Sequence, residues 1–426
     1  MIEVGQEIEL AIEKPAAGGR MIARHDGQVV LVLGAIPGER VVARIERVEK
    51  RLAFAATTRV VAPSADRRET TGDPLCGGCV YSHIAYPRQL ALKADVVADA
   101  FTRIGRVPLE TSVTVAASPE RGYRLRSRLH VRGGHIGSYR EGTHELCDVA
   151  PTGQILPDTL GAVAAAVSAL NAAGVEASSI RVSENIPASE RALHIELSFG
   201  SAKAAAALEH AVAAASLTGC SARTVTGDVL TAGSPAVSDT LRALTAGRFE
   251  GTLSRSAESF FQANRFLLPV LVTTVLDVVS AGPAGEILDL YAGVGLFSVA
   301  LAAAGHERIT AVEGDRHSGA DLRRNAAAWP AVWPIVGAVE DYLAGTRGIP
   351  PATIVVDPPR TGISRQAMEA VVAAGATRVI YVSCDPPTMA RDARRLLDGG
   401  YRLSSLRAFD LFPNTPHVES LGVFDR

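Results

Sequence analysis

Cysteines are scarce in this chain and long apolar runs are missing. Only five cysteines are spread over 426 residues, which excludes a disulfide framework. In a reducing compartment we expect each to be a free thiol, a metal ligand or a nucleophile. No segment reads as membrane-spanning, and the acidic, alternating start MIEVGQEIELAIEK is unlike a secretory signal. The sequence therefore predicts a soluble cytoplasmic protein that does not contact a membrane, with two or three domains at this length.

Net charge is also nearly absent, at −2 for the whole chain. This excludes little, because a polyanion responds to a local patch and not to the sum. Such a patch lies between residues 121 and 140, where several arginines occur without any acidic residue. In YRLRSRLHVR the arginines alternate with apolar residues, so a strand would present Arg124, Arg126, Arg128 and Arg132 to phosphates. A solvated strand face is the alternative.

The first 60 residues alternate apolar and polar side chains in short runs separated by Gly and Pro-Gly turns. This pattern predicts a small antiparallel barrel. The stretch GGRMIARHDGQVVLVLGAIPGERVVARI resembles a TRAM domain, an RNA-binding module of the oligonucleotide-binding barrel type, although any small barrel would show such alternation. We expect residues 61–115 to hold a linker, the CGGC segment and an amphipathic helix, and residues 116–247 to form a middle α/β domain that binds RNA.

From 248 to 426 strands and helices alternate, which predicts a Rossmann-like α/β domain with its ligand at the carboxyl ends of the strands. The loop DLYAGVGLF follows a strand and opens a helix, so its glycines allow a ligand close to the backbone. Glu313 ends the next strand, where a carboxylate can accept both hydroxyls of a ribose. S-adenosylmethionine is favoured over NAD because the loop lacks a full GxGxxG. The candidate cofactor-binding residues of the loop are Asp289, Tyr291, Gly293 and Gly295.

Two further motifs follow strands and should lie on the same rim. Asp357 stands in DPPR, beside a stiff turn that suits hydrogen bonding to a planar base. Arg360 ends that motif, where a methyltransferase acting on amino groups would more typically carry an aromatic residue. Cys384 stands in VSCDP, where its thiol would face the ligand crevice. We expect it to be a nucleophile, although most strand cysteines are buried and inert.

Together these motifs resemble the RNA 5-methyluridine methyltransferases, which modify uracil in transfer and ribosomal RNA. The resemblance runs nearly end to end and includes CGGC, GYRLRSRLHVR, FFQAN, DLYAGVGLF, DPPRTG, VSCDP and DLFPNTPHVESLGVF. It implies that Gln262, Glu313 and the Gly293 loop bind S-adenosylmethionine and that Asp357 contacts cofactor or uracil. It also implies that Cys384 is the nucleophile and Glu419 the base.

The resemblance makes RNA the expected partner of a monomeric enzyme. The TRAM-like start favours 23S ribosomal RNA, with transfer RNA as the alternative. A TRAM-bearing RNA-binding protein that has lost its activity is a hypothesis of another class. A cytosine methyltransferase is a third, but its cysteine usually follows the strand that here ends in Asp357.

The chain departs from the family pattern in two places. Many members hold an iron-sulfur cluster on four cysteines, whereas here Thr70 and Thr152 stand at two of those positions. We expect no cluster, with a site on Cys76, Cys79 and Cys147 as the alternative. The residue after the nucleophile, usually Asn, is Asp385.

Overall fold

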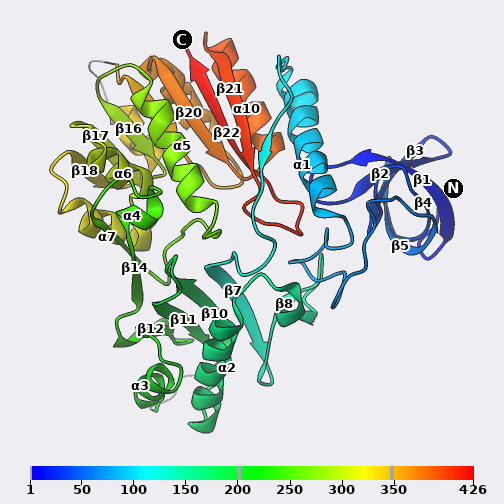
Figure 1. Ribbon diagram of the computed structural model, residues 1–426, viewed down its shortest axis with the longest axis horizontal. Coiled ribbons are helices and arrows are strands. Elements are labelled where there is room, and N and C mark those ends of the chain that lie inside the picture. The colour runs from blue at the N-terminus through cyan, green and yellow to red at the C-terminus, as the bar shows by residue number, and fades with distance from the viewer. Residues whose placement is uncertain (1, 199–202, 346–349) are drawn as a thin grey trace.

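The computed structural model describes residues 2–198, 203–345 and 350–426. They form three regions, with the N-terminal strands to one side, a middle sheet below and the C-terminal sheet above (Figure 1). The N-terminal strands close into a barrel in the order β1-β2-β3-β5-β4, which confirms the predicted barrel. Side chains of β1 alternate between exposed and buried, as its sequence does. The barrel strands are β1 (Glu7–Pro15), β2 (Met21–His25), β3 (Gln28–Leu33), β4 (Arg40–Val48) and β5 (Leu52–Ala62).

The segment after the barrel packs on the C-terminal sheet. It contains α1 (Tyr86–Ala100), which has a proline in its first turn, and the π-helical turn η1 (Phe101–Gly105). Val97 and Phe101 are buried in the same core as the C-terminal strands. The short strand β6 (Val115–Ala116) then pairs with β21 at the edge of that sheet.

The middle sheet has the order β13-β12-β11-β10-β7-β8-β9. Apolar residues of α2 and α3 share one core with its strands. Its elements are β7 (Arg126–Arg132), β8 (His135–Tyr139), β9 (Leu146–Asp148), η2 (Ala150–Thr152), α2 (Pro157–Ala172), β10 (Ala177–Glu184), β11 (Arg191–Leu197), α3 (Ala204–Ala214), β12 (Gly219–Arg223) and β13 (Val229–Gly233). The hairpin of β14 (Ala236–Thr240) and β15 (Thr252–Ser256), with α4 (Leu241–Leu244) between them, leads on to the C-terminal sheet.

The C-terminal sheet has the order β18-β17-β16-β19-β20-β22-β21-β6. Strands β16 to β20 are parallel, and β22 is inserted antiparallel between β20 and β21. Its elements are α5 (Leu268–Ser280), β16 (Ile287–Leu290), α6 (Leu296–Ala303), β17 (Ile309–Glu313), α7 (Arg316–Ala326), β18 (Val332–Val336), α8 (Val339–Gly345), β19 (Thr353–Val356), α9 (Arg365–Ala374), β20 (Arg378–Ser383), α10 (Pro386–Asp398), β21 (Arg402–Phe409) and β22 (Glu419–Asp425). The predicted Rossmann-like class is confirmed.

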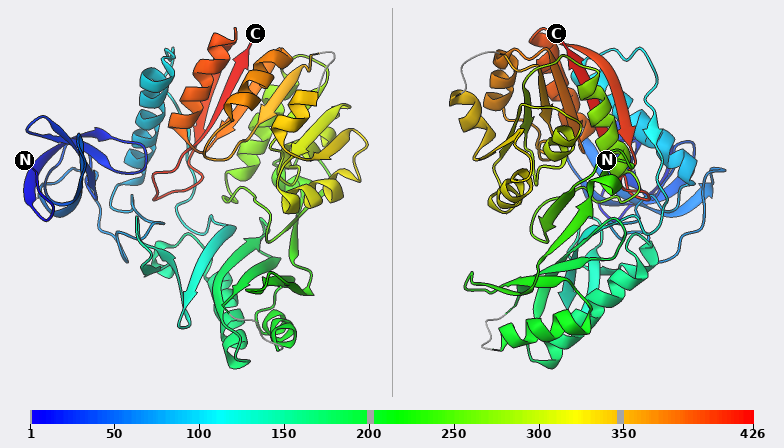
Figure 2. Two further views of the ribbon diagram at one scale, coloured as in Figure 1. Left: turned by 180° about the vertical axis from the view of Figure 1, so that it is seen from behind. Right: turned by 60° about the vertical axis from the view of Figure 1, so that its left-hand side comes forward.

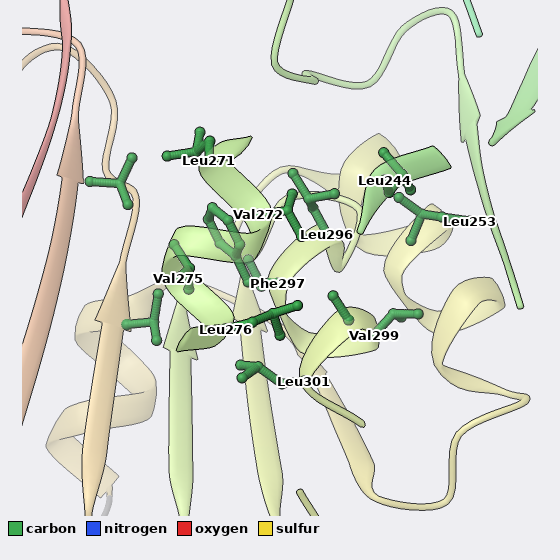
Figure 3. Packing of buried hydrophobic residues seen from close by; sticks show 14 of the residues in the cluster. Leu244, Leu253, Leu271, Val272, Val275, Leu276, Leu296, Phe297, Val299 and Leu301 are labelled. Carbon is green, nitrogen blue, oxygen red and sulfur yellow. The ribbon is translucent and has the colours of Figure 1, made fainter. Parts of the chain in front are cut away.

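Chain order reverses at β16, which pairs with β17 on one side and β19 on the other. Ligands of such sheets bind outside the carboxyl ends of the strands at this point. Helices α5 and α6 cover the sheet there, and their leucines and valines interdigitate (Figure 3). Each such buried side chain contributes about 1.5–3 kcal/mol, which fixes the strand ends that carry the site. In the described part of the chain, no helix combines the length and apolarity that crossing a bilayer requires.

Candidate active site

The carboxyl ends of the parallel strands open into a cavity of about 710 Å³. This volume is in the range of small-molecule sites. The predicted catalytic and cofactor-binding residues that line it are Gln262, Tyr291, Gly293, Glu313, Asp357, Cys384 and Glu419. The lining does not include Asp289 or Gly295, which were also predicted to bind the cofactor.

Asp289 holds the loop from inside the fold. It is fully buried, and its Oδ2 accepts hydrogen bonds from the backbone N–H and the hydroxyl of Ser298, at 3.1 and 2.5 Å. Burial raises the pKa of Asp289 to about 7. The residue therefore ties β16 to the first turn of α6 and shapes the loop between them.

That loop has an unusual backbone. Tyr291 has φ = 61°, a left-handed conformation that is uncommon outside glycine, and Gly293 and Gly295 also have positive φ. A Cβ atom on Gly295 would lie 2.8 Å from the Leu322 side chain, whereas one on Gly293 would meet nothing within 4 Å. Gly295 is thus required by packing, and Gly293 leaves open space at the cavity wall.

Glu313 joins the loop to the next strand. Its Oε2 accepts from the backbone N–H of Gly293 at 2.7 Å, and its Oε1 accepts from that of Asp315 at 2.6 Å. Burial raises the pKa of Glu313, and these backbone donors oppose the shift. Each carboxylate oxygen keeps a lone pair, so Glu313 can still accept ribose hydroxyls.

Asp357 and Gln262 meet across the cavity, where the Gln262 amide donates to Asp357 Oδ2 at 3.2 Å. Burial raises the pKa of Asp357 to about 7; Gln262 lowers it, and Asp289 and Glu313 add to the rise. A carboxyl group poised near neutrality can donate or accept a hydrogen bond, as contact with a planar base requires.

Cys384 and Glu419 lie on neighbouring antiparallel strands. Cys384 follows β20 and Glu419 begins β22, and the preceding Ser383 is paired with Ser420. Glu419 is 2% exposed, and within the described residues its Oε1 has no hydrogen-bond partner. Asp385 caps α10, since its Oδ1 accepts from the Thr388 N–H at 2.8 Å. An Asn side chain could make the same cap, which accounts for the exchange at this position.

The pair has strongly shifted acidities. Burial raises the pKa of Cys384 to about 12, and Glu419 adds to the rise. Burial and Asp357 raise the pKa of Glu419 well above its usual value. The guanidinium of Arg360, which lines the cavity, lowers the pKa of both groups. From the sequence, Arg360 was noted only because methyltransferases that act on amino groups more typically carry an aromatic residue there. Its charge acts on Cys384, so Arg360 is part of the site.

Aromatic side chains at the cavity mouth were not assigned a role from the sequence either. Phe260 lines the cavity and is 59% exposed, and the Arg126 guanidinium lies 5.4 Å from its ring centroid. An exposed ring with a neighbouring cation is suited to stack on a nucleic-acid base. The adjacent aromatics in FFQAN were the available signal.

The basic strand is β7, and its arginines occupy one face. Arg126 reaches the cavity, and burial lowers its pKa to about 10. Arg124 donates to Gln154 at 2.8 Å, while Arg128 and Arg132 are exposed farther along the strand. The face therefore leads from the cavity toward solvent, as a track for a phosphate backbone would.

The expectation that every cysteine is a free thiol, ligand or nucleophile was wrong for two of them. Cys76 and Cys147 form a disulfide, with Cα atoms 5.7 Å apart. Cys76 forms a β-bridge with Arg140, next to the β8–β9 hairpin that carries Cys147, and this bridge brings the two cysteines together. The spacing of the cysteines in the sequence does not reveal this long-range contact. Cys220 on β12 is a free thiol and is buried.

The cysteine segment does not fit an iron-sulfur cluster. Thr70, Thr152 and Cys79 line a cavity of about 200 Å³, so the two threonines do lie beside a remaining thiol. Burial raises the pKa of Cys79 to about 11, so this thiol is protonated at neutral pH in the metal-free chain. A cluster takes four thiolates, and here two of the three neighbouring sulfurs are bonded to each other.

Known proteins resemble this chain over nearly its whole length. A family model described as tRNA (uracil-5-)-methyltransferase matches residues 349–426, and a TRAM domain model matches residues 2–57. The 23S rRNA (uracil(1939)-C(5))-methyltransferase RlmD of Methylococcus capsulatus is 31% identical, over 99% of this chain and 97% of that protein. This chain belongs to the RNA uracil-5 methyltransferase family.

Other relatives of the uracil-5 methyltransferase family extend the comparison. An uncharacterized RNA methyltransferase of Streptomyces avermitilis is 31% identical over 99% of both chains. The crystal structure of the Pyrococcus abyssi tRNA (uracil-54, C5)-methyltransferase in complex with S-adenosyl-L-homocysteine has the same fold. It aligns with a TM-score of 0.74 at 22% identity, over 98% of this chain and 100% of that one.

Proposed function

We propose that the protein methylates carbon 5 of a specific uridine in 23S ribosomal RNA, with Cys384 as nucleophile and Glu419 as base. One observation carries the proposal: the thiol and the carboxylate lie on adjacent strands and line the cavity that also contains the cofactor loop. We expect it to act as a cytoplasmic monomer, because one chain supplies all these groups.

The reaction explains why these groups are needed. Carbon 5 of uracil is too poor a nucleophile to take a methyl group unaided. Addition of the Cys384 thiolate at carbon 6 converts the ring to an enolate whose carbon 5 is nucleophilic. When bound, S-adenosylmethionine supplies the electrophilic methyl group. Glu419 then removes the carbon 5 proton, the electron pair re-forms the ring double bond, and the thiolate leaves.

Other residues prepare the site. Glu313 and the Gly293 backbone would hold the ribose end of the cofactor, and Asp357 with Gln262 would hold the base or the cofactor. Arg360 stabilises the thiolate and the developing enolate charge. The target base must leave its stack, at a cost of a few kcal/mol that phosphate contacts along β7 offset.

Ribosomal RNA is the preferred substrate because the relative named above, 31% identical and matched nearly end to end, is named for 23S rRNA. Transfer RNA is the second candidate, because the matching family model and the Pyrococcus abyssi structure carry that name. Mapping 5-methyluridine in total RNA from a deletion strain separates the two. No lost 5-methyluridine in either RNA would favour an inactive RNA-binding protein.

The roles of the two catalytic residues are tested by trapping. Cys384→Ala should bind cofactor and RNA but transfer no methyl group. Glu419→Gln should form the methylated adduct and fail to release it, so protein covalently joined to RNA accumulates. Denaturing electrophoresis with labelled RNA should show a slow band for Glu419→Gln and none for Cys384→Ala or the double variant. A band in Cys384→Ala would show that another residue is the nucleophile.

A further inference from the structure

The loop of residues 410–418, which joins β21 to β22, ends directly at Glu419. Most of it is buried, including Asp410, Leu411 and Asn414. Two views show this loop descending from the C-terminal strands beside the lower end of α1 (Figures 1 and 2). The loop is therefore internal structure, and what holds it also fixes the start of β22.

Helix α1 contacts the loop at two points. Lys93 Nζ donates to Asp410 Oδ1 at 2.5 Å and to the carbonyl of Phe412 at 3.1 Å, with both charged side chains buried. One helical turn earlier, Gln89 Oε1 accepts from the Asn414 N–H, and Gln89 Nε2 donates to Asn414 Oδ1, both at 2.9 Å. The amide pair thus fixes both the backbone and the side chain of Asn414.

Asn414 is the turning point of the loop. Its φ of 65° is left-handed, a conformation that asparagine tolerates better than most residues. Its carbonyl accepts from the Tyr81 N–H at 2.9 Å, and its Oδ1 also accepts from Arg68 Nη2 at 2.7 Å. Tyr81 and Arg68, which precede the methyltransferase sheet in the chain, therefore both bind the loop at Asn414.

Other parts of the chain hold the same loop. Tyr123 donates to the Pro413 carbonyl at 3.2 Å, and Asn264 donates to the Leu411 carbonyl at 3.1 Å. On the barrel side, a Cβ atom on Gly19 would lie 2.8 Å from the Pro416 ring, which shows how closely this ring approaches the Gly19 backbone. The barrel, α1 and the C-terminal sheet all meet at this loop.

The anchoring of the loop bears directly on how Glu419 is held, because one of its two carboxylate oxygens, Oε1, is buried without a partner among the described residues. Its carboxylate is therefore aimed by the backbone that carries it, at the junction of the loop and β22. A general base acts within hydrogen-bond reach of its proton, so displacement of about 1 Å is costly.

We propose that Gln89 and Asn414 are positioning residues for the base, which hold the 410–418 loop so that Glu419 reaches the carbon 5 proton. This inference rests on the proposed function, in which Glu419 is the base. Cys384 follows β20 directly and lies outside the loop, so loosening the loop should slow release of the adduct more than its formation. A residue needed only for folding would slow both steps together.

The test uses Gln89→Met and Asn414→Gly in the full-length protein. Methionine keeps the length of the buried side chain and removes the amide, and glycine keeps the left-handed backbone and removes the side chain. Formation and release of the RNA adduct are followed in single turnover with labelled S-adenosylmethionine. The RNA is an unmethylated 23S rRNA transcript, or a transfer RNA transcript if the wild type methylates that. We expect release to slow about tenfold or more, while formation stays within about threefold of wild type.

Two controls separate the outcomes. Leu208→Ala creates a cavity at a fully buried side chain of α3, in the core of the middle sheet, which contains no residue of the 410–418 loop; it should lower stability without trapping adduct. Equal slowing of formation and release in the test variants, or release at the wild-type rate, overturns the positioning role. Glu419→Gln runs alongside: if it traps adduct and the test variants do not, only this inference fails. If Glu419→Gln itself traps nothing, the proposed base fails and the inference falls with it.

Discussion

At the scale of single residues, the resting thiol of Cys384 is protonated. Burial and the neighbouring Glu419 raise its pKa to about 12. Below that pH the thiolate fraction grows tenfold for each unit of pH, so at neutral pH the proposed nucleophile of the free protein is almost entirely in its unreactive thiol form. Activation must accompany substrate binding, when water leaves the cavity and the charge of Arg360 acts at lower dielectric.

We therefore predict that iodoacetamide labels Cys384 in the free enzyme at a rate that rises about tenfold per pH unit from pH 7 to 10, because only the thiolate reacts. An unperturbed thiol, with a pKa of about 8.5, would level off above pH 9. Peptide mapping by mass spectrometry assigns the label, with Cys384→Ala as the blank. A plateau near pH 9 would mean that the burial seen here does not control the thiol.

Arg360 supplies the matched variant. Because its guanidinium lowers the pKa of Cys384, Arg360→Leu should slow the same alkylation about threefold or more at pH 8, whereas Arg360→Lys should retain most of the wild-type rate. Methyl transfer should fall further than alkylation, since the enolate also loses its cation. Identical alkylation rates in all three proteins would remove Arg360 from the activation of the thiol.

At the scale of elements, the cofactor loop depends on the conformation of one glycine. Gly295 is the N-cap residue of α6 and has φ = 88°, and a Cβ atom there would press on Leu322. We predict that Gly295→Ala destabilises the protein by about 1–3 kcal/mol, because it combines backbone strain with overpacking. Affinity for S-adenosyl-L-homocysteine, measured by calorimetry, should fall with it.

Gly293→Ala is the matched control for that element. Its φ is also positive, so it carries the backbone cost, but its Cβ would enter open space. Denaturant titration should show a smaller loss of stability than for Gly295→Ala. If the two variants lose equal stability, packing against Leu322 is not what demands glycine at 295.

Strand β7 gives a prediction about RNA. Arg128 and Arg132 lie exposed beyond the cavity, so Arg128→Gln or Arg132→Gln should weaken RNA binding and reduce the slope of log affinity against log salt by about 0.7–0.9 each. The kcat at saturating RNA should stay near wild type. Arg402 is exposed on β21 of the C-terminal sheet, in register with Asp425, and Arg402→Gln should leave the slope unchanged.

The sequence predicted these elements well because their signals are local. Alternation gave the barrel and β7, and strand–helix succession gave the parallel sheet and the rim where Asp357 and Cys384 lie. The structural role of Asp289 could not be predicted. A carboxylate before a glycine-rich loop gives the same sequence pattern whether its side chain faces a ligand or, as here, Ser298. The hydrogen bonds between Gln89 and Asn414 could not be predicted either, because they join residues far apart in the chain.

At the scale of the whole molecule, regions that precede the methyltransferase sheet belong to its active site. The barrel touches the loop before Glu419, α1 anchors that loop, and β7 and the FFQAN segment bring Arg126 and Phe260 to the cavity mouth. Under the proposed function, RNA that follows β7 would reach a site whose base, Glu419, is positioned by the N-terminal third of the chain. RNA recognition and removal of the carbon 5 proton would then depend on the same N-terminal part of the structure.

The last prediction concerns the bond that secures this scaffold. The Cys76–Cys147 disulfide ties the segment before α1 to the middle sheet across a sequence separation of 71 residues. Closing so long a loop stabilises the fold by about 2–4 kcal/mol. Without reductant, Cys147→Ser should lose about that much free energy of unfolding in denaturant titration. In reductant the wild type should fall to the same value, which makes it its own control.

Thiol counting decides between the bond and a metal site. In denaturant without reductant, maleimide should label Cys79, Cys220 and Cys384, and reduction should add Cys76 and Cys147. Labelling of all five before reduction would show that the bond does not form. About four irons per chain after anaerobic purification, with matching sulfide, would show instead that these sulfurs hold a cluster with help from ligands other than cysteine. Because a bonded pair cannot also ligate iron, the two results exclude each other, and either one fixes how the N-terminal segment is held against the site.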